Sequence, residues 1–278
     1  MANITAADVQ KLRQLTGAGM MDCKHALNES NGDFEKAIEY LRKKGQKIAA
    51  KRAERDANEG FVLAAADPDH TYAVNVMVNC ETDFVAKNQE FSDFVKYSVE
   101  RSLLVKPKSL DEFKRMDLAG RTVQENLMDL MGKIGEKLEI AHFEVIEAPM
   151  VTAYNHFGNR LATIVGFNKR GEESVREAAH QVAMQVAAMN PVAVDKEDVD
   201  PVIVEREMEI GKEQARLEGK PEQMLDKIAQ GKLNKFYKDS TLMNQEFIRD
   251  NTKTIRQFLE SADKELKVTG FKRLMLGA

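Results

Sequence analysis

The chain has 278 residues, 43% of them hydrophobic and 31% charged, with a formal net charge of -4. It can bury a core in one to three domains, and it lacks the basic field that favours binding to nucleic acid or anionic membranes. The first residues hold no apolar signal core, no apolar run approaches a membrane span, and Cys23 and Cys80 lack CxxC spacing, so we expect a cytoplasmic protein.

Three short helices are predicted at the start of the chain. Thr5 and Asp8 form a capping pair, and Gly17 ends the first helix. The segment "MMDCKHALNES" forms the second helix, and Asp33 caps a third, "FEKAIEYLRKKG". The arrangement resembles a three-helix ubiquitin-associated (UBA-like) domain, whose binding surface is usually the loop between the first two helices, here "TGAGMM".

A basic segment, "RKKGQKIAAKRAER" (residues 42–55), follows the bundle. We interpret it as a helical linker that completes an N-terminal domain, 1–55. A nucleic-acid-binding arm is the alternative, but the segment has no interleaved aromatic residues and the chain is acidic overall. We therefore expect no direct contact with nucleic acid.

A strand, turn, strand and helix follow the linker, and the same order recurs about ninety residues later. The first pair of strands flanks the turn "DPDH", and the second begins at "MVTAYN". This recurrence predicts an α+β core of two related subdomains, N at 56–146 and C at 147–195. A charged segment at 196–239 then predicts an antiparallel helical hairpin, or coiled coil, inserted before the second part of subdomain C, 240–278.

Motifs for chemistry are missing from the sequence. No G-x-x-x-x-G-K-[ST] occurs, and "GAGMMD" lacks the third glycine and the preceding strand of a dinucleotide loop. The five histidines have no metal-ligand spacing. We therefore predict a binding protein without cofactor or metal rather than an enzyme.

Two long segments, "LRQLTGAGMMDCKHAL" and "VNCETDFVAKN", are similar to the signature segments of the elongation factor Ts family, as are "KIGEKLEI" and "YNHFGNR". The resemblance covers essentially the whole chain. It implies a guanine-nucleotide exchange factor for elongation factor Tu that binds both the GDP-bound and the nucleotide-free form. Exchange of this kind needs differential binding rather than bond chemistry.

The segment "TDFV" has two interpretations. Phe84 lies seven residues before Phe91, and this spacing alone favours a core aromatic on one helical face. The family resemblance instead implies that Thr82, Asp83, Phe84 and Val85 form an exposed tip. In that family the tip enters the G domain of elongation factor Tu near its Mg²⁺ site and switch region.

The resemblance implies further partner contacts, at Arg13, Met20, Met21, Lys24, Ile134, Gly135 and His156. Each has a simpler alternative: Met20 shares a helical face with the core, Arg13 and Lys24 are solvated charges, and His156 is a turn residue. Many family members carry a histidine where this chain has Gln185, so we expect a polar contact to differ there.

Two other functions remain open from the residues. A UBA-like adaptor or chaperone would use only the first bundle, and it predicts that "TDFVAK" is buried. An enzyme predicts a pocket with convergent titratable groups. The sequence also allows a homodimer through the helical hairpin.

Overall fold

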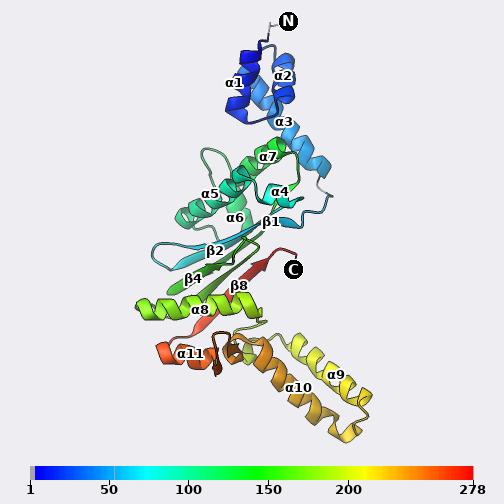
Figure 1. Cartoon of the computed structure of the whole chain (residues 1–278), viewed down its shortest axis with the longest axis vertical. Helices are drawn as coiled ribbons and strands as arrows, with labels where there is room; N and C mark the ends of the chain where they lie inside the picture. The colour runs from blue at the N-terminus through cyan, green and yellow to red at the C-terminus, as the bar shows by residue number, and fades with distance from the viewer. Residues whose placement is uncertain (1–3, 53, 278) are drawn as a thin grey trace. The chain divides into compact units, whose positions relative to one another are not determined.

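The computed structural model describes residues 4–52 and 54–277. The predicted segments 1–55 and 240–278 include residues 1–3, 53 and 278, which lie outside the described residues. Helices and small sheets share the chain (Figure 1), which confirms the α+β prediction. Among the described residues, no helix has both the length and the apolarity needed to cross a bilayer.

The chain divides into two compact units. Unit 1 comprises Met1–Leu63, Val76–Glu144 and Met275–Ala278. Unit 2 comprises Ala64–Asn75 and Val145–Leu274.

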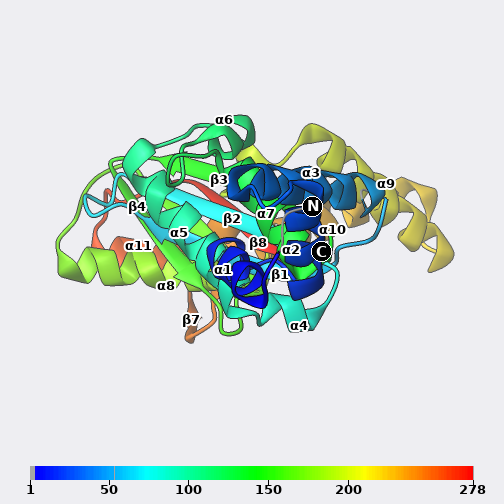
Figure 2. The ribbon, with the colours of Figure 1, turned by 90° about the horizontal axis from the view of Figure 1, so that it is seen from above.

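The N-terminal helices of unit 1 are α1 (Ala6–Thr16), α2 (Met20–Glu29) and α3 (Phe34–Arg52), seen from two directions in Figures 1 and 2. Thr5 and Asp8 form the predicted capping box. Gly17 ends α1 with φ 67°, a left-handed conformation that glycine adopts without steric cost. Leu12 and Leu27 are fully buried among the small residues at the centre of the bundle.

The predicted basic linker is helical, because α3 continues through it as far as Arg52. Gly45 lies inside this helix and faces Gly132 of α7 (Val123–Ile134). A Cβ on Gly132 would lie 3.1 Å from the Cα of Gly45. The two glycines therefore permit a close helix crossing, which explains a glycine in the middle of a long helix.

The first sheet has the strand order β1-β2-β3, from β1 (Glu59–Ala66), β2 (Tyr72–Cys80) and β3 (Leu138–Glu147). The predicted "DPDH" turn joins β1 to β2, and Asp67 accepts hydrogen bonds there from the backbone of Thr71 (2.8 Å) and Tyr72 (3.0 Å). Strand β2 is central and buried along almost its whole length. The helices that follow it are α4 (Asp83–Ala86), α5 (Gln89–Val105), α6 (Leu110–Arg115) and α7.

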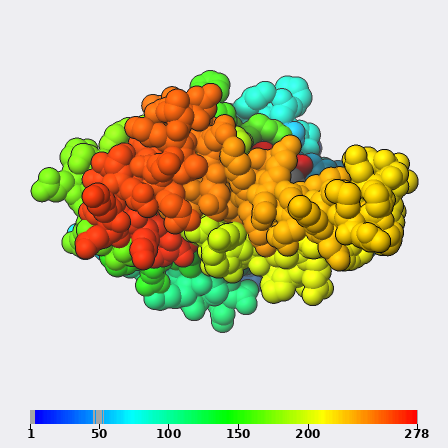
Figure 3. Space-filling view, turned by 90° about the horizontal axis from the view of Figure 1, so that it is seen from below, coloured from blue at the N-terminus to red at the C-terminus, as the bar shows by residue number. Residues whose placement is uncertain are grey.

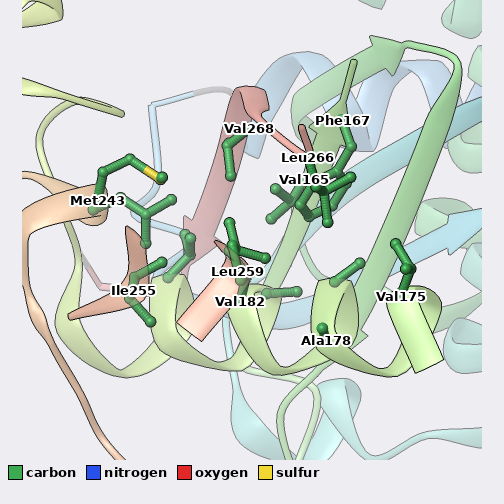
Figure 4. Packing of buried hydrophobic residues seen from close by; sticks show 14 of the residues in the cluster. Val165, Phe167, Val175, Ala178, Val182, Met243, Ile255, Leu259, Leu266 and Val268 are labelled. Atoms are coloured by element: carbon green, nitrogen blue, oxygen red, sulfur yellow. The ribbon is translucent and has the colours of Figure 1, made fainter. Parts of the chain in front are cut away.

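The second sheet, in unit 2, has the order β4-β5-β8, from β4 (Met150–Asn155), β5 (Leu161–Phe167) and β8 (Val268–Met275). Helix α8 (Glu173–Met189) covers it. Val182 of α8, Val165 of β5 and Leu259 of α11 (Ile255–Ala262) meet in one core (Figure 4). The order strand, turn, strand, helix thus occurs twice, in β1-β2-α5 and in β4-β5-α8.

Helices α9 (Pro201–Leu217) and α10 (Leu225–Ser240) pack against each other as a hairpin. Figure 3 shows the hairpin, in yellow to orange, extending from the orange-red surface that includes α11. A Cβ on Gly211 would lie 3.1 Å from the Cα of Ala229, so small residues set the helix separation. The short elements around it are η1 (Lys196–Asp198), η2 (Glu222–Met224), η3 (Leu242–Asn244), β6 (Glu246–Phe247) and β7 (Asp250–Thr254).

Leu259→Ala tests the core of unit 2. Leu259 is fully buried, so we expect the free energy of unfolding to fall by about 2 to 5 kcal/mol from lost burial and a cavity. Leu217→Ala is the matched control, because this leucine is 83% exposed and should change stability by less than about 0.5 kcal/mol. Urea unfolding followed by circular dichroism measures the free energy of unfolding of both variants. Equal losses of stability in the two variants would contradict the core shown in Figure 4.

Candidate partner-binding site

The predicted tip, Thr82 to Val85, lies at the end of β2 in unit 1. Phe84 is 81% exposed, whereas its neighbour Val85 is 8% exposed and packs into the fold. The core interpretation of Phe84 from its spacing is therefore wrong. Helix α4 ends at Ala86, and Asn88 starts a new helix by accepting a hydrogen bond from the backbone of Phe91 (3.2 Å). Because the helix is interrupted, the seven-residue spacing does not place both rings on one face.

Thr82 is the N-cap of this short helix. Its hydroxyl accepts a hydrogen bond from the backbone N–H of Val85 (3.4 Å). The next residue, Asp83, is exposed and accepts a hydrogen bond from Lys87 (2.7 Å), which lowers the pKa of its carboxyl. The tip thus presents a carboxylate and an aromatic ring side by side.

Two glutamates that the sequence analysis did not single out hold the base of the tip. Glu136 accepts hydrogen bonds from the backbone N–H of Thr82 (3.2 Å) and from its hydroxyl (2.9 Å). In the opposite direction, Glu81 accepts a hydrogen bond from the backbone N–H of Lys137 (2.6 Å). We call this pair of reciprocal contacts the crossed clamp. Its sequence signal was available, because each glutamate lies inside a quoted family segment.

Glu81 is also surrounded by positive charge. Arg52 donates to one of its carboxylate oxygens at 2.7 Å and Arg55 to the other at 3.0 Å. Partial burial works against ionisation, but the hydrogen bonds from Lys137, Arg52 and Arg55 prevail and lower the pKa of Glu81 to about 2. The clamp is therefore tied to the C-terminal end of α3.

The clamp brings Ile134 and Gly135 to the same part of unit 1 as the tip. Ile134 is the last residue of α7, and Gly135 caps that helix with φ 79°. Both are partly exposed, and they directly precede Glu136 in the chain. Two segments far apart in the sequence, 82–85 and 134–135, therefore share one hydrogen-bonded support.

The predicted bundle contacts lie around the connection between α1 and α2. Arg13 and Lys24 are exposed, and Met20 and Met21 are 56% and 73% exposed. The alternative that Met20 belongs to the core is therefore wrong, although its helical neighbours Cys23 and Leu27 are buried. Leu15, which the sequence analysis did not single out, is also exposed.

His156 lies on the turn between β4 and β5, in unit 2. The Tyr154 hydroxyl and the His156 Nδ1 are 2.9 Å apart, within hydrogen-bonding distance. The next residue, Phe157, is 98% exposed, and sequence patterning gave no signal for it. The turn thus presents an aromatic ring beside the predicted histidine.

Gln185, where we expect a polar contact to differ from that of many family members, does not lie on a surface. It is fully buried in α8. Its amide nitrogen donates to the backbone oxygen of Glu246 (3.1 Å), and its amide oxygen accepts from the backbone N–H of Ile248 (3.0 Å). Gln185 therefore anchors the segment around β6 from inside unit 2.

Metal-ligand geometry and thiol reactivity in the described residues bear on possible chemistry. No group of histidine, cysteine or acidic side chains within them has the geometry to hold a metal ion. Burial raises the pKa of the Cys80 thiol to about 12, and the charges of Glu136 and Glu59 act in the same direction. This thiol therefore remains protonated at neutral pH and is a poor nucleophile.

A cavity of about 740 Å³ lies in unit 1, lined by the α1–α2 connection, α3, α5 and α7. Two of its acidic residues are ion-paired, Asp22 with Lys44 and Asp129 with Arg121. The charges of these two carboxylates are therefore compensated within unit 1.

Comparisons with known proteins agree on one family. A family profile described as "Elongation factor TS" matches residues 81–278. A protein named "Elongation factor Ts" from Christiangramia forsetii is 50% identical over 277 residues, which is 100% of both chains. Proteins of the same name from Cytophaga hutchinsonii (52% over 277 residues, 99% of this chain and 100% of the relative) and Flavobacterium psychrophilum (50% over 278 residues, 100% of both) are similar throughout.

The Glu81 contacts predict a pH-dependent contribution to stability. The folded pKa lies below the ordinary value of 4.5, so the carboxylate stabilises the fold above about pH 4.5, and this contribution is lost as the pH falls towards 2. Glu81→Gln should lower the free energy of unfolding by about 2 to 3 kcal/mol at pH 7, and the difference from wild type should shrink towards pH 2.

Urea unfolding at stepped pH measures this difference. Glu139→Gln is the control, because this side chain is 52% exposed and pairs with the amine of Lys137 at 3.3 Å. We expect its effect to stay below about 1 kcal/mol at every pH. If the difference in free energy of unfolding between Glu81→Gln and wild type does not change with pH, the lowered pKa of Glu81 is contradicted.

Proposed function

This chain belongs to the elongation factor Ts family, and we propose that it is a guanine-nucleotide exchange factor that binds elongation factor Tu·GDP and promotes GDP release in translation elongation. The observation that carries the proposal is the exposure of Phe84, at 81%, on a tip whose base is hydrogen-bonded. A large apolar side chain that a hydrogen-bonded support holds outward is available to fill a pocket on a partner. As a translation factor, the protein would act in the cytoplasm.

The proposed mechanism is differential binding. Burial of a phenylalanine in a partner pocket stabilises a complex by roughly 1.5 to 3 kcal/mol. If the pocket opens only when Mg²⁺ and switch contacts of elongation factor Tu are displaced, this free energy shifts the partner towards a state that holds GDP weakly. In this proposal Asp83 acts beside Phe84 near the Mg²⁺ site, and Thr82 and Val85 hold the tip. No bond of the nucleotide is made or broken.

We propose that the other predicted residues extend the contact. Arg13, Met20, Met21 and Lys24 would bind from the bundle, and Ile134 and Gly135 from the end of α7. His156 would bind from unit 2. The support for these assignments is exposure or partial exposure at each position.

We also propose the finer domain assignments. Segment 1–55 would be a UBA-like domain with its linker, 56–146 subdomain N, and 147–195 with 240–278 subdomain C. The hairpin, 196–239, would be a coiled-coil arm, supported by the close approach of Gly211 to Ala229. An adaptor that uses only the bundle is the competing function, and it predicts a buried tip, which the exposure of Phe84 disfavours.

Phe84→Ala should slow stimulated GDP release by about 10- to 100-fold, because it removes the ring proposed to enter the partner. Thermal unfolding should be nearly unchanged, since the ring contributes little to the core. Release of fluorescent GDP from elongation factor Tu measures the effect. Leu104→Ala, at another exposed apolar side chain (73%), is the control and should keep full activity.

The comparison with a core residue separates the two interpretations of Phe84. Phe91→Ala removes a fully buried ring and should cost about 3 to 5 kcal/mol of stability. A loss of that size in Phe84→Ala would restore the core interpretation.

Linkage gives a second prediction. If this protein weakens GDP binding to elongation factor Tu, GDP must weaken the protein-protein complex by the same factor. Calorimetric titrations into nucleotide-free elongation factor Tu, into its GDP form and into its Mg²⁺·GDP form should therefore give affinities that fall in that order. Replacing both Asp83 and Phe84 with alanine should reduce the difference between the affinity for nucleotide-free elongation factor Tu and the affinity for its Mg²⁺·GDP form. Equal affinities for the three forms would favour the adaptor.

A further inference from the structure

The crossed clamp lies where the pairing of two neighbouring strands stops. Strand β2 ends at Cys80 and β3 begins at Leu138, and the two are adjacent in the sheet. Beyond these ends, side-chain carboxylates rather than carbonyls accept the backbone hydrogen bonds: Glu136 binds the N–H of Thr82, and Glu81 binds the N–H of Lys137. Side-chain hydrogen bonds therefore continue the link between the two segments as far as Thr82, two residues after β2, and Lys137, one residue before β3.

Helix α4 needs such support. It has four residues, too few to be stable alone, because helix nucleation is unfavourable. The Thr82 hydroxyl donates to Glu136 and at the same time accepts from the N–H of Val85, so one carboxylate fixes both the backbone and the cap of the helix. Hydrogen bonds to a charged acceptor are also stronger than neutral ones.

We propose that Glu136 and Glu81 are positioning residues for partner binding, which hold Phe84 in one orientation and keep segments 82–85 and 134–135 as one rigid surface. The inference rests on the proposed exchange function. If the tip is already ordered before binding, less of the binding free energy is lost to immobilising it. A larger part of the binding free energy then stabilises the altered state of the partner. Glu81 extends the same support to Arg52, the last residue of α3, which packs with α1 and α2 in the N-terminal bundle.

The absence of tryptophan from the sequence allows a direct test of orientation. Phe84→Trp introduces a single tryptophan at the tip, and time-resolved anisotropy of the free protein, with excitation that selects tryptophan over the five tyrosines, reports its motion. In the Phe84→Trp background, Glu136→Ala should add a fast, large-amplitude anisotropy decay. Glu136→Gln should show a smaller fast decay, because its amide oxygen can still accept a hydrogen bond from Thr82. Glu139→Ala is the control and should give the same decay as Phe84→Trp alone. No change in Glu136→Ala would overturn the proposal.

Exchange kinetics give the second measurement, in the wild-type background. Glu136→Ala should lower the maximal rate of GDP release by about ten-fold, with little change in the concentration of factor that gives half-maximal rate. Glu136→Gln should lie between Glu136→Ala and wild type. A merely destabilised protein would instead lose active fraction, so its half-maximal concentration would rise. That result, or an unchanged maximal rate, would overturn the proposal.

Two other results can be interpreted separately: a Glu136→Ala variant that does not fold, and a wild-type protein that does not stimulate GDP release. If Glu136→Ala does not fold, amide hydrogen exchange of wild type decides the matter: protection at Thr82 and Lys137 supports the clamp, and exchange at the unstructured rate overturns it. If wild type fails to stimulate GDP release at all, the exchange function is wrong, and the positioning role for partner binding falls with it. In that case the anisotropy test still reports whether the clamp orders the tip.

Discussion

Two backbone N–H groups at the ends of neighbouring strands need acceptors, and the way this chain supplies them determines the geometry of the tip. A buried or half-buried N–H without an acceptor is costly, so a strand end requires either water or a side chain. Glu81 and Glu136 meet this need across the gap between the segments. Since α4 begins directly beyond the clamp, the direction in which Phe84 extends follows from these two carboxylates.

Neighbouring residues on α4 then have opposite environments. Val85 packs inward and Phe84 points to solvent, so the buried residue anchors the turn and the exposed residue is available to a partner. The chain forgoes roughly 1.5 to 3 kcal/mol by leaving a phenylalanine ring in water. A partner pocket can recover that free energy, and this possibility links the local fold to the proposed exchange activity.

In unit 2, as at the tip, side-chain hydrogen bonds within the fold support exposed segments. Gln185 is buried in α8 and holds the backbone near β6, and the Tyr154 hydroxyl holds His156 beside the exposed Phe157. In both units an exposed turn is supported by polar side chains whose hydrogen bonds are made within the fold. Such turns need little further ordering when a partner binds.

The sequence by itself determined the main helices and strands, because capping residues, glycines and hydrophobic periodicity act over a few residues. Thr5 with Asp8 and the "DPDH" turn are of this kind. The family segments also identified the tip. Periodicity misplaced Phe84, however, because Asn88 interrupts the helix and one sequence spacing then spans two helices. Only the tertiary structure placed Glu136 against Thr82 and buried Gln185, since both contacts join segments more than fifty residues apart. Local patterns carry no information about such pairs, because the folding of the sheets and helices brings them together.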